Sequence, residues 1–312
     1  MNANVTAVAG LSGAGQARRH RSRMLVGYIV AIAMLVALAI YGFDYYTLDS
    51  AQRPLSPKYQ LLKPSGTIGL KLGMVGTAMF CAIFLYALRK RWGWLARQGT
   101  SKHWLDVHVL LGLTAPLVIA FHASFKFRGI AGMAFWIMAA VALSGVVGRY
   151  LYAQIPRSLS TAEMSLKESQ EFQAQLTQQL AMQRVISPRH LDPLFRLPSP
   201  ETVQALSILT ALVYMFALDL ARPLHVARLR MRAVGLFKSL VIFGGLLPSG
   251  NAEIERVIHL AREQAALSKR ILFLSRSQQV FHLWHVVHRP FSYSFAVLAM
   301  IHIGVVLLLG YM

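Results

Sequence analysis

Residues 24–43 read MLVGYIVAIAMLVALAIYGF, and this stretch decides the fold because no charged side chain interrupts it. The hydrocarbon core of a bilayer is about 30 Å thick, and a helix needs about 20 apolar residues to cross it. Runs of similar apolar character follow at 67–88, 104–125 and 129–153. In lipid a helix satisfies its own backbone hydrogen bonds. The sequence therefore predicts an all-α integral membrane protein.

The composition agrees with a membrane protein. Of the 312 residues, 55% are hydrophobic and only 14% are charged, and the mean hydropathy is +0.48. These values exclude an ordinary soluble domain and a disordered chain. The net charge of +20 would suit nucleic acid or a bilayer, but the apolar runs favour the bilayer, so no nucleic-acid partner is expected. A single cysteine, Cys81, excludes disulfides and thiolate-ligated clusters within this chain.

Two basic segments predict the orientation. Residues 1–23 carry four arginines among their last six residues, and residues 89–103 hold five Lys or Arg and no acidic residue. Cytoplasmic loops carry an excess of Lys and Arg. We therefore expect a multi-pass protein of a bacterial-type inner (plasma) membrane with its N-terminus in the cytoplasm.

The charge pattern divides the chain into four parts. The predicted parts are a basic tail (1–23), spans one to four (24–153), a helical cytoplasmic or interfacial insert (154–281) and a final transmembrane helix (282–312). The insert contains amphipathic patterns, which are Phe172, Leu176 and Leu180 in one helix and Ile254, Val257, Ile258 and Ala261 after a predicted N-cap at Asn251.

Two apolar segments of the insert, 203–218 and 234–247, leave the number of spans open. If both crossed as a hairpin, the arginine-rich linker between them would lie outside, against the charge rule. Helices at the interface or packed on the bundle are favoured, which gives about five spans. One or two crossings would give six or seven.

Histidines recur at one spacing in two apolar helices. The segment HVLLGLTAPLVIAFH runs from His108 to His122, and HRPFSYSFAVLAMIH runs from His288 to His302. A separation of 14 residues is close to four helical turns, or about 21 Å, so both members of a pair share one helix face. Ionisable residues at membrane depth are costly and usually functional.

This arrangement suits two haems. Imidazole is a common axial ligand of haem iron, and two helices with two histidines each would hold two bis-histidine b haems, one above the other. Parallel helices pair His108 with His288 and His122 with His302, whereas one added crossing pairs His108 with His302 and His122 with His288. Structural histidines or another metal are the alternatives, although zinc and copper sites cluster their ligands.

Other residues in or near the spans support the interpretation without deciding it. Arg149 and Arg289 on the inner side, with Lys126 and Arg128 on the outer side, could pair with haem propionates or with lipid headgroups. Asp106 could cap its helix, relay protons or orient a neighbouring ligand.

Two further patterns concern helix packing. Gly69 and Gly73 form a face where helices could approach closely. Pro290 should bend or restart the last helix.

The two histidine-bounded segments resemble those of the di-haem membrane cytochromes b, particularly the transmembrane domain of the ferric reductase and NADPH oxidase group. The resemblance covers spans two to four and the last helix, and it implies that His108, His122, His288 and His302 are axial ligands. The chain departs from the oxidases in its helical insert and in ending at Met312 without flavin and nicotinamide domains. A separate donor is therefore expected.

The resulting hypothesis is an electron-transfer subunit of an oxidoreductase rather than a complete enzyme. Its donor would be quinol or a partner iron–sulfur or flavin protein that docks on the insert, and its acceptor would lie on the other side. The alternatives are a free-standing haem oxidoreductase that reduces ferric ion or quinone, and a non-haem transporter or assembly protein with structural histidines. The sequence leaves the oligomeric state open.

Overall fold

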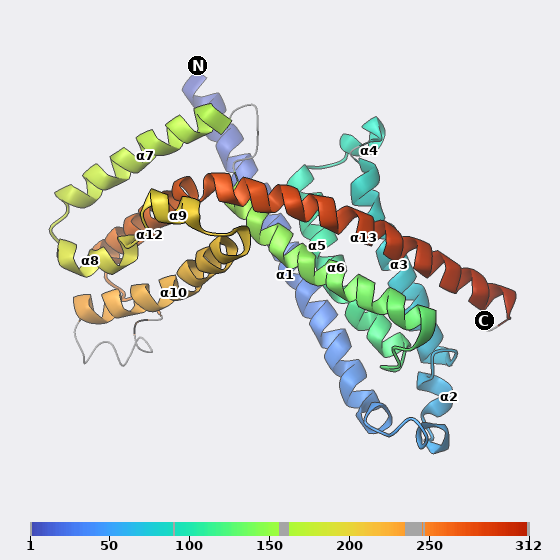
Figure 1. The fold of residues 1–312 in the computed structure, drawn as a ribbon. Helices are drawn as coiled ribbons and strands as arrows, with labels where there is room; N and C mark the ends of the chain where they lie inside the picture. The colour runs from blue at the N-terminus through green and yellow to red at the C-terminus, as the bar shows by residue number, and fades with distance from the viewer. Residues whose placement is uncertain (1, 90, 156–161, 235–244, 246, 311–312) are drawn as a thin grey trace. The chain divides into compact units, whose positions relative to one another are not determined.

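The computed structural model describes the whole chain except residues 1, 90, 156–161, 235–244, 246 and 311–312 (Figure 1). Throughout the described part the regular structure is helical and contains no strand. Six of these helices are long and apolar enough to cross a membrane. The all-α, multi-pass membrane fold predicted from the sequence is confirmed.

The chain forms two compact units. Unit 1 comprises Met1–Arg149 and Val286–Met312, and unit 2 comprises Tyr150–His285. The long helices of unit 1 are α1 (Asn2–Tyr46), α3 (Thr67–Arg89), α5 (Ser101–His122), most of α6 (Gly129–Gln154) and the greater part of α13 (Leu274–Leu308). The predicted final helix begins earlier than expected, and it continues through Pro290 without restarting.

Helices α3 and α5 form the most extensively packed pair in unit 1. Gly73 makes this approach possible, since a Cβ atom there would lie 2.8 Å from the His122 ring. At Gly76 an added Cβ would lie 2.9 Å from Cγ1 of Ile119. The predicted close approach is confirmed at Gly73, whereas a Cβ atom at Gly69 would meet the carbonyl of Lys63 before α3 and not α5.

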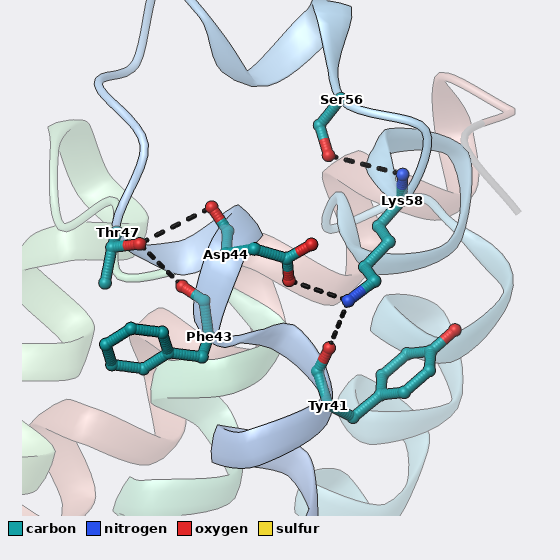
Figure 2. Close-up of polar contacts among 6 residues, drawn as sticks. All are labelled: Tyr41, Phe43, Asp44, Thr47, Ser56 and Lys58. Atoms are coloured by element: carbon teal, nitrogen blue, oxygen red, sulfur yellow. Dashed lines mark hydrogen bonds and ion pairs between the residues drawn. The ribbon is translucent and has the colours of Figure 1, made fainter.

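The loop after α1 folds back onto the end of that helix (Figure 2). The Lys58 ammonium donates to the carbonyl of Tyr41 at 2.6 Å and pairs with the Asp44 carboxylate at 2.7 Å. Thr47 Oγ1 donates to the carbonyl of Phe43 at 2.7 Å. This loop contains η1 (Arg53–Leu55) and α2 (Tyr59–Leu62).

Buried Arg53 ties the same loop to the end of α5. Its guanidinium donates to the carbonyls of Tyr46, Leu48 and Ser124. Ser124 has a φ of 48°, a left-handed conformation that is uncommon for a residue with a side chain. Its hydroxyl donates to the carbonyl of Leu62 at 2.7 Å, so hydrogen bonds hold the turn in this conformation.

At the other end of the bundle, Arg89 closes the loop between α3 and α5. This loop contains α4 (Gly93–Ala96). Arg89 donates to the Ser101 hydroxyl at 2.8 Å and to the carbonyls of Ala96 and Gly99 at 2.9 Å. Both loops of the first three spans are therefore closed by a buried arginine bonded to backbone carbonyls.

Unit 2 is a helical assembly around an apolar core. Its helices are α7 (Ala162–Met182), α8 (Pro188–Phe195), α9 (Pro200–Ala205), α10 (Ile208–Val234) and α12 (Ala252–Leu272). The main cluster joins all of these except α9 and contains Leu180, Ile186, Leu191, Leu194, Val226, Leu229, Ile254, Val257, Ile258 and Ala261.

The amphipathic patterns of the insert are largely observed. The Asn251 side chain accepts hydrogen bonds from the backbone N–H groups of Glu253 and Ile254, which confirms the predicted N-cap of α12. Leu176 and Leu180 are buried, but Phe172 remains exposed, so the predicted α7 stripe is shorter than expected.

Helix α10 unites segments that the sequence analysis treated separately. It begins at Ile208, inside the predicted apolar segment 203–218, and continues through Pro223 and the arginine-rich linker to Val234. The prediction for 234–247 falls mostly on residues 235–244 and 246, which lie outside the described residues.

Candidate functional site

The four histidines predicted from the sequence all lie in unit 1. Helix α5 carries His108 and His122, and α13 carries His288 and His302. All four side chains are half-buried. Helices α5 and α13 are not among the closely packed pairs of this unit. A planar group that is ligated by one imidazole from each of two helices requires such a separation.

Both histidines of α5 are held by backbone carbonyls of α3. Nδ1 of His122 lies 2.8 Å from the carbonyl oxygen of Gly69, and Nδ1 of His108 lies 3.2 Å from that of Ile83. A carbonyl oxygen only accepts hydrogen bonds, so each Nδ1 is the donor and each Nε2 carries the lone pair. Gly69 and Ile83 are themselves 14 residues apart, so antiparallel α3 reproduces the spacing of the histidines.

On α13, a hydroxyl group orients His288. Nδ1 of His288 lies 2.7 Å from Oγ of Ser144 in α6, and that hydroxyl also lies 2.8 Å from the carbonyl of Val141. The hydroxyl has one proton, and it donates this proton to the Val141 carbonyl. Ser144 Oγ therefore accepts the hydrogen bond from His288 Nδ1. His288 therefore has the same tautomer as the two histidines of α5. Gly145 is adjacent, and a Cβ there would lie 3.9 Å from the His288 ring.

Contacts along the helices indicate which histidines share a depth. Arg149 on α6 pairs with Asp106 on α5, two residues before His108, and Ser144, which bonds His288, lies about 7.5 Å along α6 from Arg149. His288 therefore lies near the level of His108. The pairing of His122 with His302 stays a prediction.

A polar cluster lies at the end of α5 that carries His108. Asp106 accepts from His20 Nε2 at 3.0 Å and from Arg149 at 2.8 Å. The His20 ring stacks on His103 with centroids 3.7 Å apart. Arg149, predicted as a propionate partner, is thus engaged by Asp106, and the sequence analysis missed His20 because nothing in its local pattern indicates a contact 86 residues away.

The side chains of the other predicted propionate partners are exposed. Lys126 and Arg128 are exposed in the connection between α5 and α6, and Arg289 is exposed on α13 next to His288. Only Arg289 adjoins a histidine of the site in sequence. The expectation that these cations contact a cofactor stays a prediction.

The donor set fits bis-imidazole ligation. Metal-ligating histidines usually donate their second ring N–H to a carbonyl, carboxylate or water, and His108, His122 and His288 each do so with an acceptor on a neighbouring helix. In the described part of the chain no three His, Cys, Asp or Glu side chains converge on one point. Bis-histidine haem ligation needs one histidine from each of two helices, and α5 and α13 carry two each.

Comparisons of the chain with protein-family models, with characterised proteins and with solved structures find no match.

Proposed function

We propose that this chain is a di-haem b-type membrane cytochrome that transfers electrons across or along the membrane. The observation that carries the proposal is the hydrogen bonding of Nδ1 in three histidines spaced for two haems. Two haems, when bound, supply iron that accepts and releases one electron at a time. His108 with His288, and His122 with His302, are the axial ligands in this proposal.

The surrounding residues position the ligands rather than react. The Gly69 and Ile83 carbonyls and the Ser144 hydroxyl fix the ring orientation by accepting from Nδ1, which makes Nε2 the ligating nitrogen in this proposal. Each of these hydrogen bonds also makes the imidazole a more basic ligand. The apolar helices keep water from the ligands, which strengthens the electrostatic influence of the nearby Asp106 and Arg149 pair.

The proposed donor is quinol or a partner iron–sulfur or flavin protein, and the proposed acceptor lies on the opposite face. Unit 2 is a docking surface for such a partner, since it combines basic residues with a folded helical core. The positive-inside rule puts the N-terminus in the cytoplasm of a bacterial-type cell.

The visible spectrum of the purified protein tests the haem proposal. A dithionite-reduced minus oxidised spectrum should show a b-type α band, and pyridine haemochrome analysis should return two haems per chain. His122→Ala should remove one haem and leave the other. The matched control is His282→Ala, since His282 is exposed on α13 and should retain both.

A colourless protein after expression with ample iron and tetrapyrrole would reject the proposal and favour structural histidines in a transporter or assembly protein. If haem is present, quinol is added to membranes that hold the protein alone. Reduction of the haems by quinol without a partner would identify quinol as the direct donor.

A further inference from the structure

The face of α10 that unit 2 leaves open is apolar, like the face that it covers. Five large apolar side chains are between 55% and 69% exposed, and they recur at intervals of three or four residues: Leu209, Val213, Phe216, Leu220 and Leu224. We call them the α10 stripe. They share one side of the helix over about 22 Å.

The covered side of α10 holds Ala211, Met215, Val226 and Leu229 in the apolar core of unit 2. The polar contacts of α10 lie between this side and the stripe. Asp219 accepts from the Tyr150 hydroxyl at 2.8 Å and pairs with Lys269, and Arg230 donates to both carboxylate oxygens of Glu255 at 2.7 and 2.9 Å. A surface helix in water packs one apolar side inward and turns a polar side to the solvent, whereas α10 is apolar on both sides. The stripe therefore faces an apolar environment.

The neighbouring helix α12 shows that the apolar environment does not surround α10 on all sides. Phe273 at the end of α12 packs against Ala211 and Met215, whereas Ile258 near its beginning packs against Val226. Helix α12 therefore runs antiparallel beside almost the whole of α10. Its outward face exposes Arg256, His259, Arg262, Glu263 and Arg270, and so many charged groups at the depth of a crossing helix would be costly.

Two further features point to a lipid surface. Unit 2 is connected through α6 and α13, both apolar enough to cross the membrane, so the chain tethers it to the membrane at both ends. The α10 stripe continues at the same spacing into exposed Arg228 and Arg232, which can contact anionic headgroups.

We infer that α10 lies along the membrane surface, with the stripe in the acyl boundary of the lipids, and does not cross the bilayer. Interfacial helices of this kind bury their apolar face about 5–10 Å deep. This inference does not depend on haem binding.

The test measures the depth of single nitroxide labels in the full-length protein. In a Cys81→Ser background, cysteine replaces Leu209, Phe216, Leu220 or Leu224, one at a time, and the protein is reconstituted in vesicles of phosphatidylcholine and phosphatidylglycerol. Power saturation with oxygen and with a water-soluble nickel chelate gives the depth. Leu143→Cys, exposed near the middle of α6, is the deep control, and Arg256→Cys on α12 is the aqueous control.

All four stripe labels should report one shallow depth, between the two controls. A depth that increases along the helix to that of Leu143→Cys would show that α10 crosses and would overturn the inference. Labels as accessible to nickel as Arg256→Cys would show that the stripe faces water, and immobilised labels without lipid contact would show a protein partner or a second copy on it. Either result would also overturn the inference.

Discussion

At the scale of single residues, Gly73 is the position of α3 that leaves room for the His122 ring. The His122 ring lies where a side chain at position 73 would be, and its Nδ1 bonds Gly69 one turn away. The ring position thus depends on the absence of one Cβ atom.

Gly73→Val should therefore displace His122 and remove one of the two proposed haems, since an overpacked contact between α3 and α5 forces the ring away. Haem content per chain, from pyridine haemochrome, is the measurement. Gly112→Ala is the matched control, because a Cβ at that position meets nothing within 4 Å. A Gly73→Val protein with two haems would contradict the assigned role of His122.

The Ser144 hydroxyl should matter for the haem that His288 ligates. Loss of a hydrogen bond to a ligating histidine typically lowers metal affinity by about 10–100-fold, so Ser144→Ala should weaken one haem and spare the other. Haem titration of the apoprotein and redox potentiometry check this. Ser294→Ala is the control on α13, where the hydroxyl bonds only the carbonyl of Pro290. Equal effects of the two substitutions would show that Ser144 does not act through His288.

At the scale of helices, two ion pairs connect α10 to α12. Arg230 is a hydrogen-bond donor to Glu255, and this holds the pKa of the Glu255 carboxyl below its usual value of 4.5. Burial lowers the pKa of the Lys269 ammonium below its usual value, while pairing with Asp219 opposes that change.

The pH dependence of unit 2 should reflect Glu255. Because its pKa is lower in the folded state than in the unfolded state, the unfolded state binds more protons between the two values, and stability rises with pH there. The contribution is complete above pH 4.5, the ordinary pKa of this carboxyl, and is lost as the pH falls through the folded value. Glu255→Gln should flatten acid destabilisation followed by circular dichroism, whereas Glu253→Gln, at an exposed position, should not.

Replacing Lys269 tests the second pair. Lys269→Met leaves the Asp219 carboxylate in a partly buried position without its ammonium partner, which should cost about 1–3 kcal/mol of unfolding free energy in detergent. Adding Asp219→Asn should recover part of the loss, because it removes a carboxylate that would keep only Arg222 and the Tyr150 hydroxyl as partners. Arg270→Met, at the exposed neighbouring residue, should change the stability by less than about 0.5 kcal/mol. Additive losses in the double variant would contradict the pairing.

At the scale of the whole molecule, the helix order predicts which segments share a membrane side. Four helices that are long and apolar enough to cross the membrane, α1, α3, α5 and α6, precede the bulk of unit 2. The N-terminus, the loop around Trp94 and unit 2 should therefore lie together, with the loop around Leu55 on the other side.

Thiol labelling in a Cys81→Ser background measures this arrangement. Trp94→Cys and Met182→Cys, both at exposed positions, should react with an impermeant reagent in inside-out vesicles. Leu55→Cys, at an 85% exposed position, should react only in right-side-out vesicles. Protection of Met182→Cys where Trp94→Cys reacts would place unit 2 on the other side and reverse the proposed topology.

Much of the fold could be predicted because membrane helices are encoded locally. Apolar length predicted the first four spans, the hydropathy change predicted a helical insert, and Asn251 predicted the start of α12. The continuity of α10 could not be predicted in this way, since its apolar beginning and basic end differ in composition but share one backbone helix.

For the candidate site, the sequence by itself determined the two histidine pairs, because a spacing of 14 residues repeats wherever the backbone is helical. Only the tertiary structure decided how the rings are held. The Gly69 carbonyl, the Ser144 hydroxyl and the His20 contact with Asp106 join residues that are far apart in the chain. Such contacts depend on the rotation and depth of one helix against another, which side-chain packing between helices fixes and which no local pattern along the chain records.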